Sequence, residues 1–398
     1  MGSWLVLALL GLTLLSLFLT LWQWLEGRLF PLHRRSRAAG PLPGITLLKP
    51  LKGREDATEA CLRSWLTQNY AGPVQVLFAV GAADDPVRPV VERLLAEHPE
   101  LDAECVVCPE LRGANVKVAK LARLEPLARH EVLVISDADV KVPPDFLANL
   151  VVPFADAGVG LVHCFYRLSE PVTAAMQCEA VAINADFWTS VLQAIRLAPM
   201  RFALGAVMAV RRSASEAIGG LGVLRDFLAD DYELGRRVSR TGARVTLCPV
   251  VVDCCAPPQG WRRVWRHQLR WARTIRVCQP LPYAASIVSN VTLWPLLLLL
   301  AAPGRPGALM LAGCLLTRIV TALDNQRRLC QSLAHLPWWW LPPVKDLLQL
   351  AWWTLAFLGN CVEWRGRRLR VTRQGKMEPC HPLEPLPDWA ASETGPLP

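Results

Sequence analysis

The chain has 398 residues, of which 52% are hydrophobic and 19% charged, with 16 tryptophans and a formal net charge of +9. This apolar composition excludes an ordinary soluble protein and leaves room for one sizeable domain with a membrane portion. Because arginines cluster beside the apolar segments, we attribute the positive charge to contact with an anionic membrane and expect no nucleic-acid partner.

Residues 1–27 are predicted to form an N-terminal transmembrane anchor. The run from Trp4 to Leu25 is long and apolar enough to cross a bilayer, and no basic residue precedes it as in a secretory signal peptide. A basic linker follows at 28–44, with Arg28, Arg34 and Arg35 near its start. The positive-inside rule therefore predicts that the next domain is cytoplasmic.

Residues 45–260 alternate between strand-like and helix-like segments. The expected strands are 45–48, 74–80, 103–107, 132–136 and 160–166, and the expected helices are 57–67, 87–98, 113–127 and 173–195. Such alternation predicts an α/β domain with a mostly parallel sheet covered on both faces.

Two carboxylates follow the most apolar of these strands. Val132 to Ser136 reads as a buried strand, and Asp137 and Asp139 come directly after it. Ligands of α/β sheets collect beyond the carboxyl ends of the strands, and a spacing of two lets both acids reach one cation. We interpret the pair as a site for Mg²⁺ or Mn²⁺, the alternative being an acidic turn without a ligand.

A second acidic group opens a later helix at Asp230, Asp231 and Glu233. Acids in the first turn are favoured by the helix dipole, so simple capping is one interpretation. The lone His163, on an apolar strand, is expected to be a core residue.

Residues 261–280 are predicted to form an amphipathic helix at the membrane surface. On a helical wheel the apolar residues share one arc and the arginines lie opposite, so Arg270 is expected to face the protein. The C-terminal membrane region covers 281–375, with spans expected at 281–302 and 307–323. The stretch 347–364 either crosses or re-enters the membrane, and 376–398 is expected to be a disordered tail.

Seven short motifs in this order resemble those of ceramide glucosyltransferases and of the bacterial glycosyltransferases of hopanoid synthesis. They are Leu48-Lys-Pro-Leu-Lys-Gly53, Asp84-Asp-Pro86, Asn115-Val-Lys117, Ser136-Asp-Ala-Asp139, Gly160-Leu-Val-His163, Ala229-Asp-Asp-Tyr232 and Arg270-Trp271. The resemblance implies a GT-A nucleotide-sugar domain over 45–260. The chain departs from the usual pattern at His267, and it has Asp230-Asp231 where Glu-Asp is common.

The resemblance also implies roles for individual residues in nucleotide-sugar binding. Asp84 or Asp85 would bind the uridine of a UDP-sugar donor, and Asn115 and Lys117 would position the nucleotide. Asp137 would contribute to the same site while holding the metal ion with Asp139.

For the transfer itself, the resemblance implies that Asp231 is the general base and that Arg270 stabilises the departing diphosphate. Trp271 would line the entrance for a membrane lipid acceptor. A single base without an enzyme nucleophile implies inversion at the sugar carbon.

The expected activity is thus an inverting membrane hexosyltransferase, with UDP-glucose and ceramide as the first pair of substrates. Alternatives are transfer of N-acetylglucosamine or another sugar to a hopanoid or other lipid, a polysaccharide synthase, and a non-catalytic membrane scaffold. The bacterial branch implies an inner-membrane location.

Overall fold

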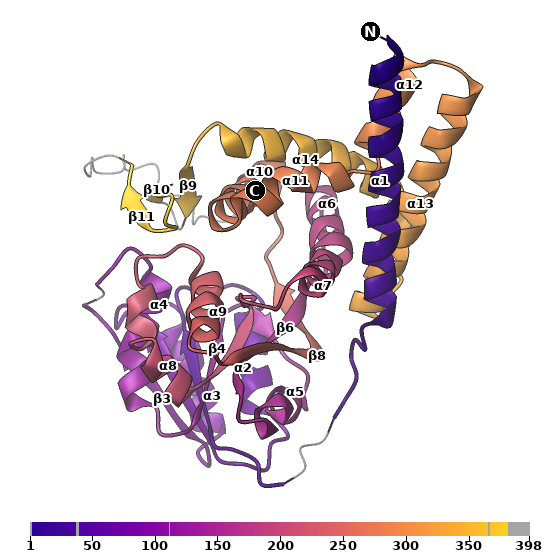
Figure 1. The fold of residues 1–398 in the computed structure, drawn as a ribbon. Helices are drawn as coiled ribbons and strands as arrows, with labels where there is room; N and C mark the ends of the chain where they lie inside the picture. Colours follow the sequence, from indigo (N-terminus) through magenta and orange to yellow (C-terminus); the bar gives the residue numbers. More distant parts are fainter. Residues whose placement is uncertain (1, 37–39, 111, 365–366, 381–398) are drawn as a thin grey trace.

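The computed structural model describes residues 2–36, 40–110, 112–364 and 367–380. Figure 1 shows an α/β domain below and a helical part above it. In the helical part α1 (Gly2–Leu29) stands beside α13 (Arg305–Cys330), while α10 (Trp261–Cys278) and α14 (Leu341–Phe357) lie across the top of the α/β domain.

The α/β domain is built on an eight-stranded sheet with the order β3-β2-β1-β4-β7-β6-β8-β5. Its strands are β1 (Ile45–Pro50), β2 (Val74–Val80), β3 (Asp102–Val107), β4 (Val132–Ser136), β5 (Val140–Lys141), β6 (Val159–Ser169), β7 (Val207–Arg211) and β8 (Arg244–Cys255). Only β5 and β7 run antiparallel to their neighbours. The predicted mostly parallel sheet is confirmed.

Helices cover both faces of this sheet because its strands are apolar on both. Along β1, Leu47 packs into the core on one face and the next residue, Leu48, into the core on the other. The first face is covered by α2 (Thr58–Leu66), α3 (Arg88–Glu97) and α5 (Phe146–Leu150), and the second by α4 (Val116–Leu124), α8 (Arg212–Ala217) and α9 (Asp230–Arg240).

The long helical stretch predicted at 173–195 is continuous but contains a π-helix. It consists of α6 (Ala174–Ala180), the π-helical segment η3 (Val181–Phe187) and α7 (Trp188–Leu197). Extra residues in a π-turn rotate the side chains that follow, and such turns are common at functional sites.

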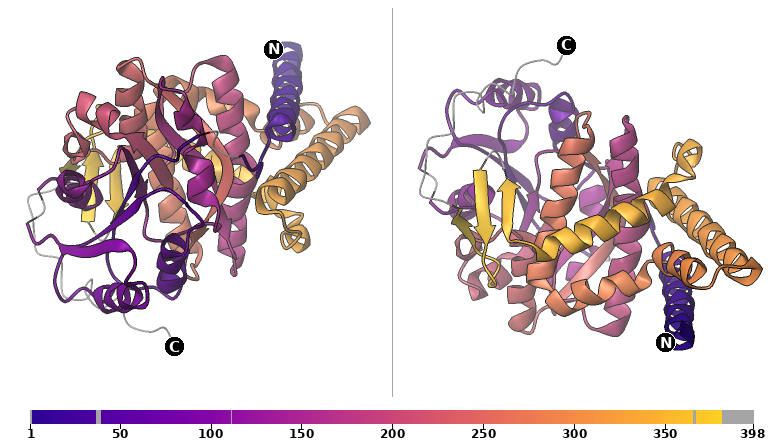
Figure 2. Two further views of the ribbon diagram at one scale, coloured as in Figure 1. Left: turned by 90° about the horizontal axis from the view of Figure 1, so that it is seen from below. Right: turned by 90° about the horizontal axis from the view of Figure 1, so that it is seen from above.

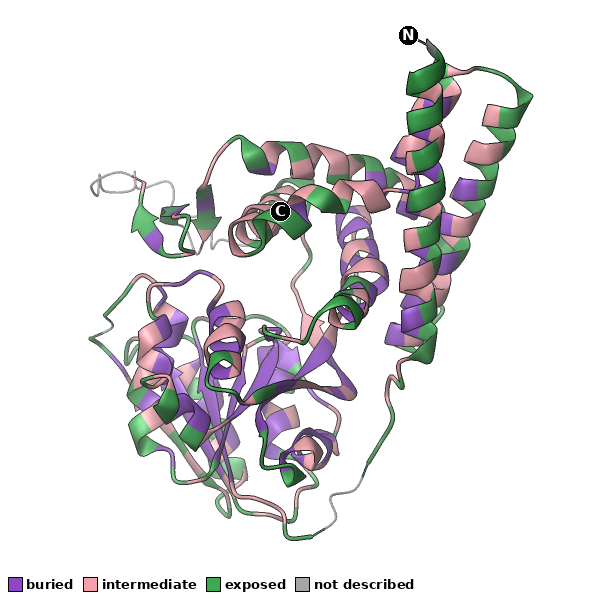
Figure 3. Ribbon diagram, in the orientation of Figure 1, coloured by how far each residue is buried: buried purple, intermediate pink, exposed green. Residues whose placement is uncertain are grey.

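Helices α1 and α13 are each long and apolar enough to cross a membrane. Large apolar side chains remain exposed on both, among them Leu14 and Phe18 of α1 and Leu309 and Leu316 of α13. Figure 3 shows this exposure along the length of α1. Side chains of this kind are stable against lipid, so both predicted membrane segments agree with the structure.

The span predicted at 281–302 is bent instead of straight. It is divided into α11 (Pro280–Ala285), the 3-10 turn η5 (Ser286–Ser289) and α12 (Leu293–Ala301), with an angle of 57° at the break. Asn290 explains the break, because its side-chain oxygen accepts the backbone N–H groups of Thr292 and Leu293 and so starts a new helix.

The end of the chain also differs from the expectation. Helix α14 begins near α13, extends over the α/β domain and ends at Phe357, so the stretch 347–364 is not a single apolar helix (Figure 1). A three-stranded sheet follows, of β9 (Cys361–Trp364), β10 (Arg367–Val371) and β11 (Met377–Pro379). The predicted tail 376–398 therefore begins with a strand, and residues 381–398 lie outside the described residues.

The apolar face of α10 is partly covered by protein. Val264 is fully buried, and the Trp265 ring packs 5.3 Å from the ring of Trp352 in α14. Figure 2 shows α14 lying along α10 in the view from above. On this apolar face Trp261 and Ile275 remain exposed. Most of the other apolar residues are covered by α14 and by the helix that contains the π-turn.

Candidate active site

The acidic pair at the end of β4 rests on a buried lysine. Lys49, from the neighbouring strand β1, donates to the Asp137 carbonyl oxygen at 2.6 Å and to Ser136 Oγ at 3.1 Å. Its ammonium also lies 5.2 Å from the centre of the Trp65 ring. Burial lowers the pKa of Lys49 to about 8, although the nearby carboxylates favour its charge. Lys49 thus fixes the backbone of the turn that carries both acids.

The environment of the two acids fits a divalent cation. The protein around Asp139 withdraws its carboxylate from bulk water. This desolvation, with the charge of Asp137, raises the pKa of Asp139 to about 6. A cation between the two carboxylates would relieve their repulsion. Within the described ranges no third His, Cys, Asp or Glu completes a metal-binding group, so other ligands would come from diphosphate oxygens and water.

Lys117 connects the acidic turn to helix α9. Its Nζ atom lies 2.7 Å from Asp137 Oδ1 and 3.2 Å from Asp230 Oδ2. Burial opposes the charge of Lys117, but the two carboxylates outweigh it and hold its pKa above the usual value. Asn115 caps α4 by accepting the Val118 N–H, and its own amide donates to Asp230 at 3.3 Å. Asn115, Lys117, Asp137 and Asp230 form one network, of which only the half-exposed Asp137 reaches the surface of the site.

The capping interpretation of the second acidic group is wrong for Asp230. The N-cap residue Ala229 makes no side-chain hydrogen bond, and the Asp230 carboxylate binds Lys117 instead. Within the first turn it is Asp231 Oδ1 that accepts a backbone N–H, that of Tyr232, at 2.8 Å. Asp231 turns the other way, towards the segment before β7, where a Cβ atom on Gly205 would lie 2.9 Å from Asp231 Oδ2. Burial and the charge of Asp230 raise the pKa of Asp231 to about 6, which suits a general base near neutral pH.

Helix α10 brings Arg270 to the same site. Burial lowers the pKa of Arg270, and the nearby carboxylates of Glu179, Asp231 and Asp137 oppose this shift. Arg270 is thus near both the acidic turn and the candidate base, on the helix whose next residue, Trp271, packs against Phe187.

Glu179 holds this helix in place. The Glu179 carboxylate lies 2.6 Å from Nδ1 of His267 and accepts a 2.9 Å hydrogen bond from Gln268. The unusual His267 thus has a structural partner one turn before Arg270.

An aromatic wall borders the site beside Arg270. The Trp271 ring lies 5.9 Å from Phe187, and Phe187 lies 5.7 Å from Tyr166. Phe187 is the last residue of the π-helical segment η3. Trp271 is thus placed on an apolar surface that could guide a lipid towards Asp231.

Asp84 and Asp85 lie in the loop after β2, at the same edge of the sheet as the acidic turn. Asp85 accepts the Gly53 N–H at 2.9 Å and the Val87 N–H at 3.1 Å, so it joins the loops after β1 and β2. Asp84 is exposed beside it. This loop and the acidic turn lie at the same edge of the sheet because β1 pairs in parallel with both β2 and β4.

Several site residues were not predicted from sequence. Lys49 lies in a motif that was recognised, but its burial under the turn depends on strand pairing. Tyr166 and Glu179 reach the site from β6 and α6, and no local pattern marks them. His163 is a core residue as expected: it is buried beside Met200, and burial lowers its pKa to about 3.

Comparison with known proteins identifies the relatives of this chain. A ceramide glucosyltransferase of Candida albicans is 30% identical over 27% of this chain and 22% of its own, and ceramide glucosyltransferase 1 of Caenorhabditis elegans is 23% identical over 55% and 47%. An N-acetylglucosaminyltransferase of Bradyrhizobium diazoefficiens is 26% identical over 75% and 60%. The chain thus spans less than two thirds of the length of each of these relatives.

The fold is shared with a mannosyltransferase of Pyrobaculum calidifontis, solved with GDP-mannose and Mn²⁺. The TM-score is 0.52 at 22% identity, covering 88% of this chain and 99% of the other. This confirms the expected GT-A fold. The family model of glycosyl transferase family 21 matches residues 7–377, almost the whole chain. The resemblance predicted from the motifs is confirmed, and the chain belongs to glycosyl transferase family 21.

Proposed function

We propose that this protein is an inverting membrane glycosyltransferase that moves a sugar from a UDP-sugar to a lipid hydroxyl. The observation that carries the proposal is the convergence of Asp137, Asp231 and Arg270 at one sheet edge beneath α10. Ceramide with UDP-glucose is the first candidate pair, because ceramide glucosyltransferases are among the relatives.

In this proposal the chain binds the donor with the loops at the sheet edge. Asp84 contacts the uridine, since Asp85 is engaged with Gly53. Mg²⁺ or Mn²⁺ held by Asp137 and Asp139 supplies positive charge to the diphosphate. Asn115 and Lys117 keep the acidic turn and α9 at a constant distance, and so position the nucleotide relative to the base.

The acceptor enters along the aromatic wall that includes Trp271. Asp231 removes the proton of the lipid hydroxyl as its oxygen forms a bond to the anomeric carbon and the bond to the diphosphate breaks. Arg270 stabilises the negative charge that develops on the leaving UDP. Attack from the face opposite the leaving group converts a UDP-α-sugar into a β-linked product.

A second candidate, transfer of N-acetylglucosamine to a hopanoid or another lipid, is favoured by the Bradyrhizobium relative, which aligns with the largest share of this chain among the three compared. The test is purified protein with Mn²⁺ and either UDP-glucose or UDP-N-acetylglucosamine, offered ceramide, diacylglycerol and a hopanoid. We expect one sugar per lipid, a β-anomeric proton in the product and no product with Asp231→Asn. A polymer would favour a polysaccharide synthase, and no transfer to any lipid would contradict the proposal.

We further propose that the α/β domain is cytoplasmic, in a bacterial inner membrane, since Arg28, Arg34 and Arg35 follow α1. In a variant with the exposed Cys361 changed to Ser, Gly81→Cys should react with a membrane-impermeant maleimide only after the cells are permeabilised. Labelling of Gly81→Cys in intact cells would show that the α/β domain lies outside the cytoplasm.

A further inference from the structure

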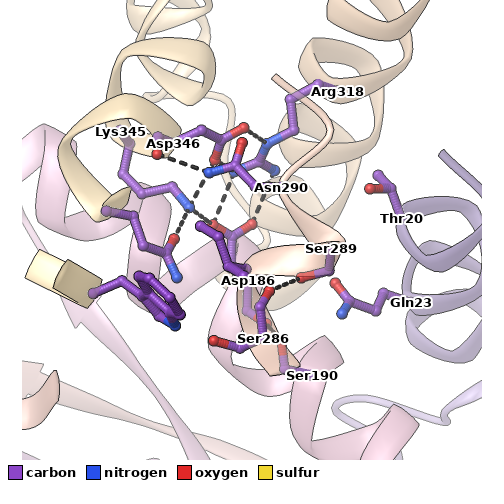
Figure 4. Close-up of a pocket in the computed structure, with 13 residues that line it drawn as sticks. Thr20, Gln23, Asp186, Ser190, Ser286, Ser289, Asn290, Arg318, Lys345 and Asp346 are labelled. Carbon is purple, nitrogen blue, oxygen red and sulfur yellow. Dashed lines mark hydrogen bonds and ion pairs between the residues drawn. The ribbon is translucent and has the colours of Figure 1, made fainter. Parts of the chain in front are cut away.

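A polar pocket lies among the helices of the membrane part, on the far side of η3 from the aromatic wall. It is enclosed by α1, α7, η5, α13 and α14 and holds about 70 Å³ of free space. Figure 4 shows charged side chains of Arg318, Lys345, Asp186 and Asp346 at one side, and hydroxyl and amide side chains at the other. Ionisable groups at such a position are costly and usually functional.

The charged side chains neutralise one another. Arg318 binds both oxygens of Asp186 and both oxygens of Asp346, all at 2.9 Å. Lys345 Nζ lies 2.5 Å from Asp186 and 2.9 Å from Asp346, and donates to Gln349 at 2.6 Å. All three protons of Lys345 are used, and two positive charges balance two negative ones. The cluster therefore has no net charge with which to attract an anion such as phosphate.

The hydroxyl groups of the pocket present acceptors, whereas the amides of Gln23, Asn290 and Gln349 also carry N–H donors. Thr20, Ser190, Ser286 and Ser289 each donate their hydroxyl proton to a backbone carbonyl three or four residues earlier, at 2.7–2.9 Å. A hydroxyl has one proton, so only its lone pairs remain for a ligand. Asp186 has the most exposed side chain of the charged cluster, at 24%, and adds a carboxylate oxygen. A ligand that matches the hydroxyl groups and Asp186 therefore supplies hydrogen-bond donors.

We propose that the pocket binds the headgroup of a membrane lipid that carries N–H or O–H donors. The free space equals roughly two water molecules of about 30 Å³ each, which suits a hydroxymethyl, amide or ammonium group. The lipid chains would lie along the exposed apolar side chains of α1 and α13. Two sources share this chemistry: a bulk lipid such as phosphatidylethanolamine, and a ceramide-like lipid. The inference depends on the membrane placement of α1 and α13 and not on sugar transfer.

The pocket is also connected to the candidate active site. Asp186 lines the pocket, and its chain neighbour Phe187 packs against Tyr166 and Trp271. A lipid bound beside Asp186 would therefore restrict the movement of Phe187 and, through it, of the Trp271 ring.

The test uses the full chain in detergent without UDP-sugar and counts bound lipids by native mass spectrometry. The lipids offered are phosphatidylethanolamine, its N-methyl and N,N-dimethyl derivatives, and phosphatidylcholine. Each has one N–H donor fewer than the lipid before it, and the rest of the molecule is unchanged. We expect affinity to fall along this series, by about tenfold in total, which corresponds to about 1.4 kcal/mol. Ceramide is tested in parallel, and whichever of the two lipids binds more tightly identifies the source.

Variants locate the site. Ser190→Ala with Ser286→Ala removes two acceptor hydroxyls without adding bulk and should abolish the preference. The matched control is Thr317→Val, which removes an exposed α13 hydroxyl bonded in the same way but outside the pocket. Equal binding of all four phospholipids, or no lipid retained, would overturn the inference. So would an equal loss in the Thr317 variant. Asp231→Asn should retain the lipid, so a failure of the proposed transfer reaction remains a separate result.

Discussion

Lys117 and Asp230 form a buried ion pair, with Nζ 3.2 Å from Oδ2, that ties α4 to the start of the helix carrying the candidate base. The same Nζ atom lies 2.7 Å from Asp137. One lysine therefore sets the spacing between the acidic turn and α9.

We predict that Lys117→Met lowers stability by about 3–5 kcal/mol, because it leaves the buried Asp230 without its counter-charge. Adding Asp230→Leu should restore part of this loss, since both charges are then removed, but should not restore transfer. The free energy of unfolding and the turnover are measured for the single and double variants. A double variant as unstable as the single one would show that the pair does not act as a unit.

Asp231→Asn should lower turnover by about 10²–10⁴, the usual contribution of a general base. UDP affinity should change little, because the uridine and metal loops lie on other strands. Asp230→Asn weakens the contacts to Lys117 and Asn115, so its main effect should be on stability, with a smaller loss of turnover. If Asp230→Asn abolished turnover while Asp231→Asn remained active, the base would be Asp230 instead of Asp231.

Activity should depend on pH through Asp231. Its pKa is raised to about 6 by burial and by Asp230, so the base becomes protonated, and turnover falls, as the pH drops through 6. Stability changes in the opposite sense: between pH 4 and 6 the folded protein keeps a proton that the unfolded chain releases, so this carboxyl costs stability as the pH rises. The acid limb of the turnover profile should be absent from the residual activity of Asp231→Asn.

Lys49→Met should weaken binding of the divalent cation by about 10–100-fold, the usual effect of removing a group that orients a ligand. The cause is loss of the bonds to Ser136 and to the Asp137 carbonyl. The exposed Lys52 in the same motif is the control, and Lys52→Met should leave the Mn²⁺ dependence unchanged. An unaltered Mn²⁺ dependence in the Lys49 variant would exclude this role.

Asp139→Ala should abolish transfer while the fold is retained, and excess EDTA should stop the native enzyme. The reason is that two adjacent carboxylates require a cation before they can accept a diphosphate. Circular dichroism and thermal unfolding control for the fold. Full turnover in EDTA would contradict the metal site.

Local patterns predicted much of the fold. The strand at 132–136 and its two acids follow from apolar β-branched residues and from residue order, and the expected strand at 74–80 has the observed bounds. The partners of these acids could not be predicted in the same way. Lys49 reaches Asp137 through strand pairing, and Asp230 contacts Lys117, which lies 113 positions earlier in the chain. The bend at Asn290 was missed because a capping residue inside an apolar run has a weak signal. The two partners of Arg318 have no local signal, because Asp186 lies in the π-helical segment and Asp346 in α14.

The small C-terminal sheet has a consequence for the order of biosynthesis. Met377 donates its N–H to the Asp226 carbonyl at 2.7 Å, Lys376 forms a bridge with Phe227, and Leu228 packs into the core of this sheet. These contacts hold the segment that leads directly into α9, yet they come from residues translated after every helix of the membrane part. The ribosome must therefore deliver α1 through α14 before these contacts can form. In a nascent chain that has not yet reached β11, the segment before the candidate base Asp231 lacks this support.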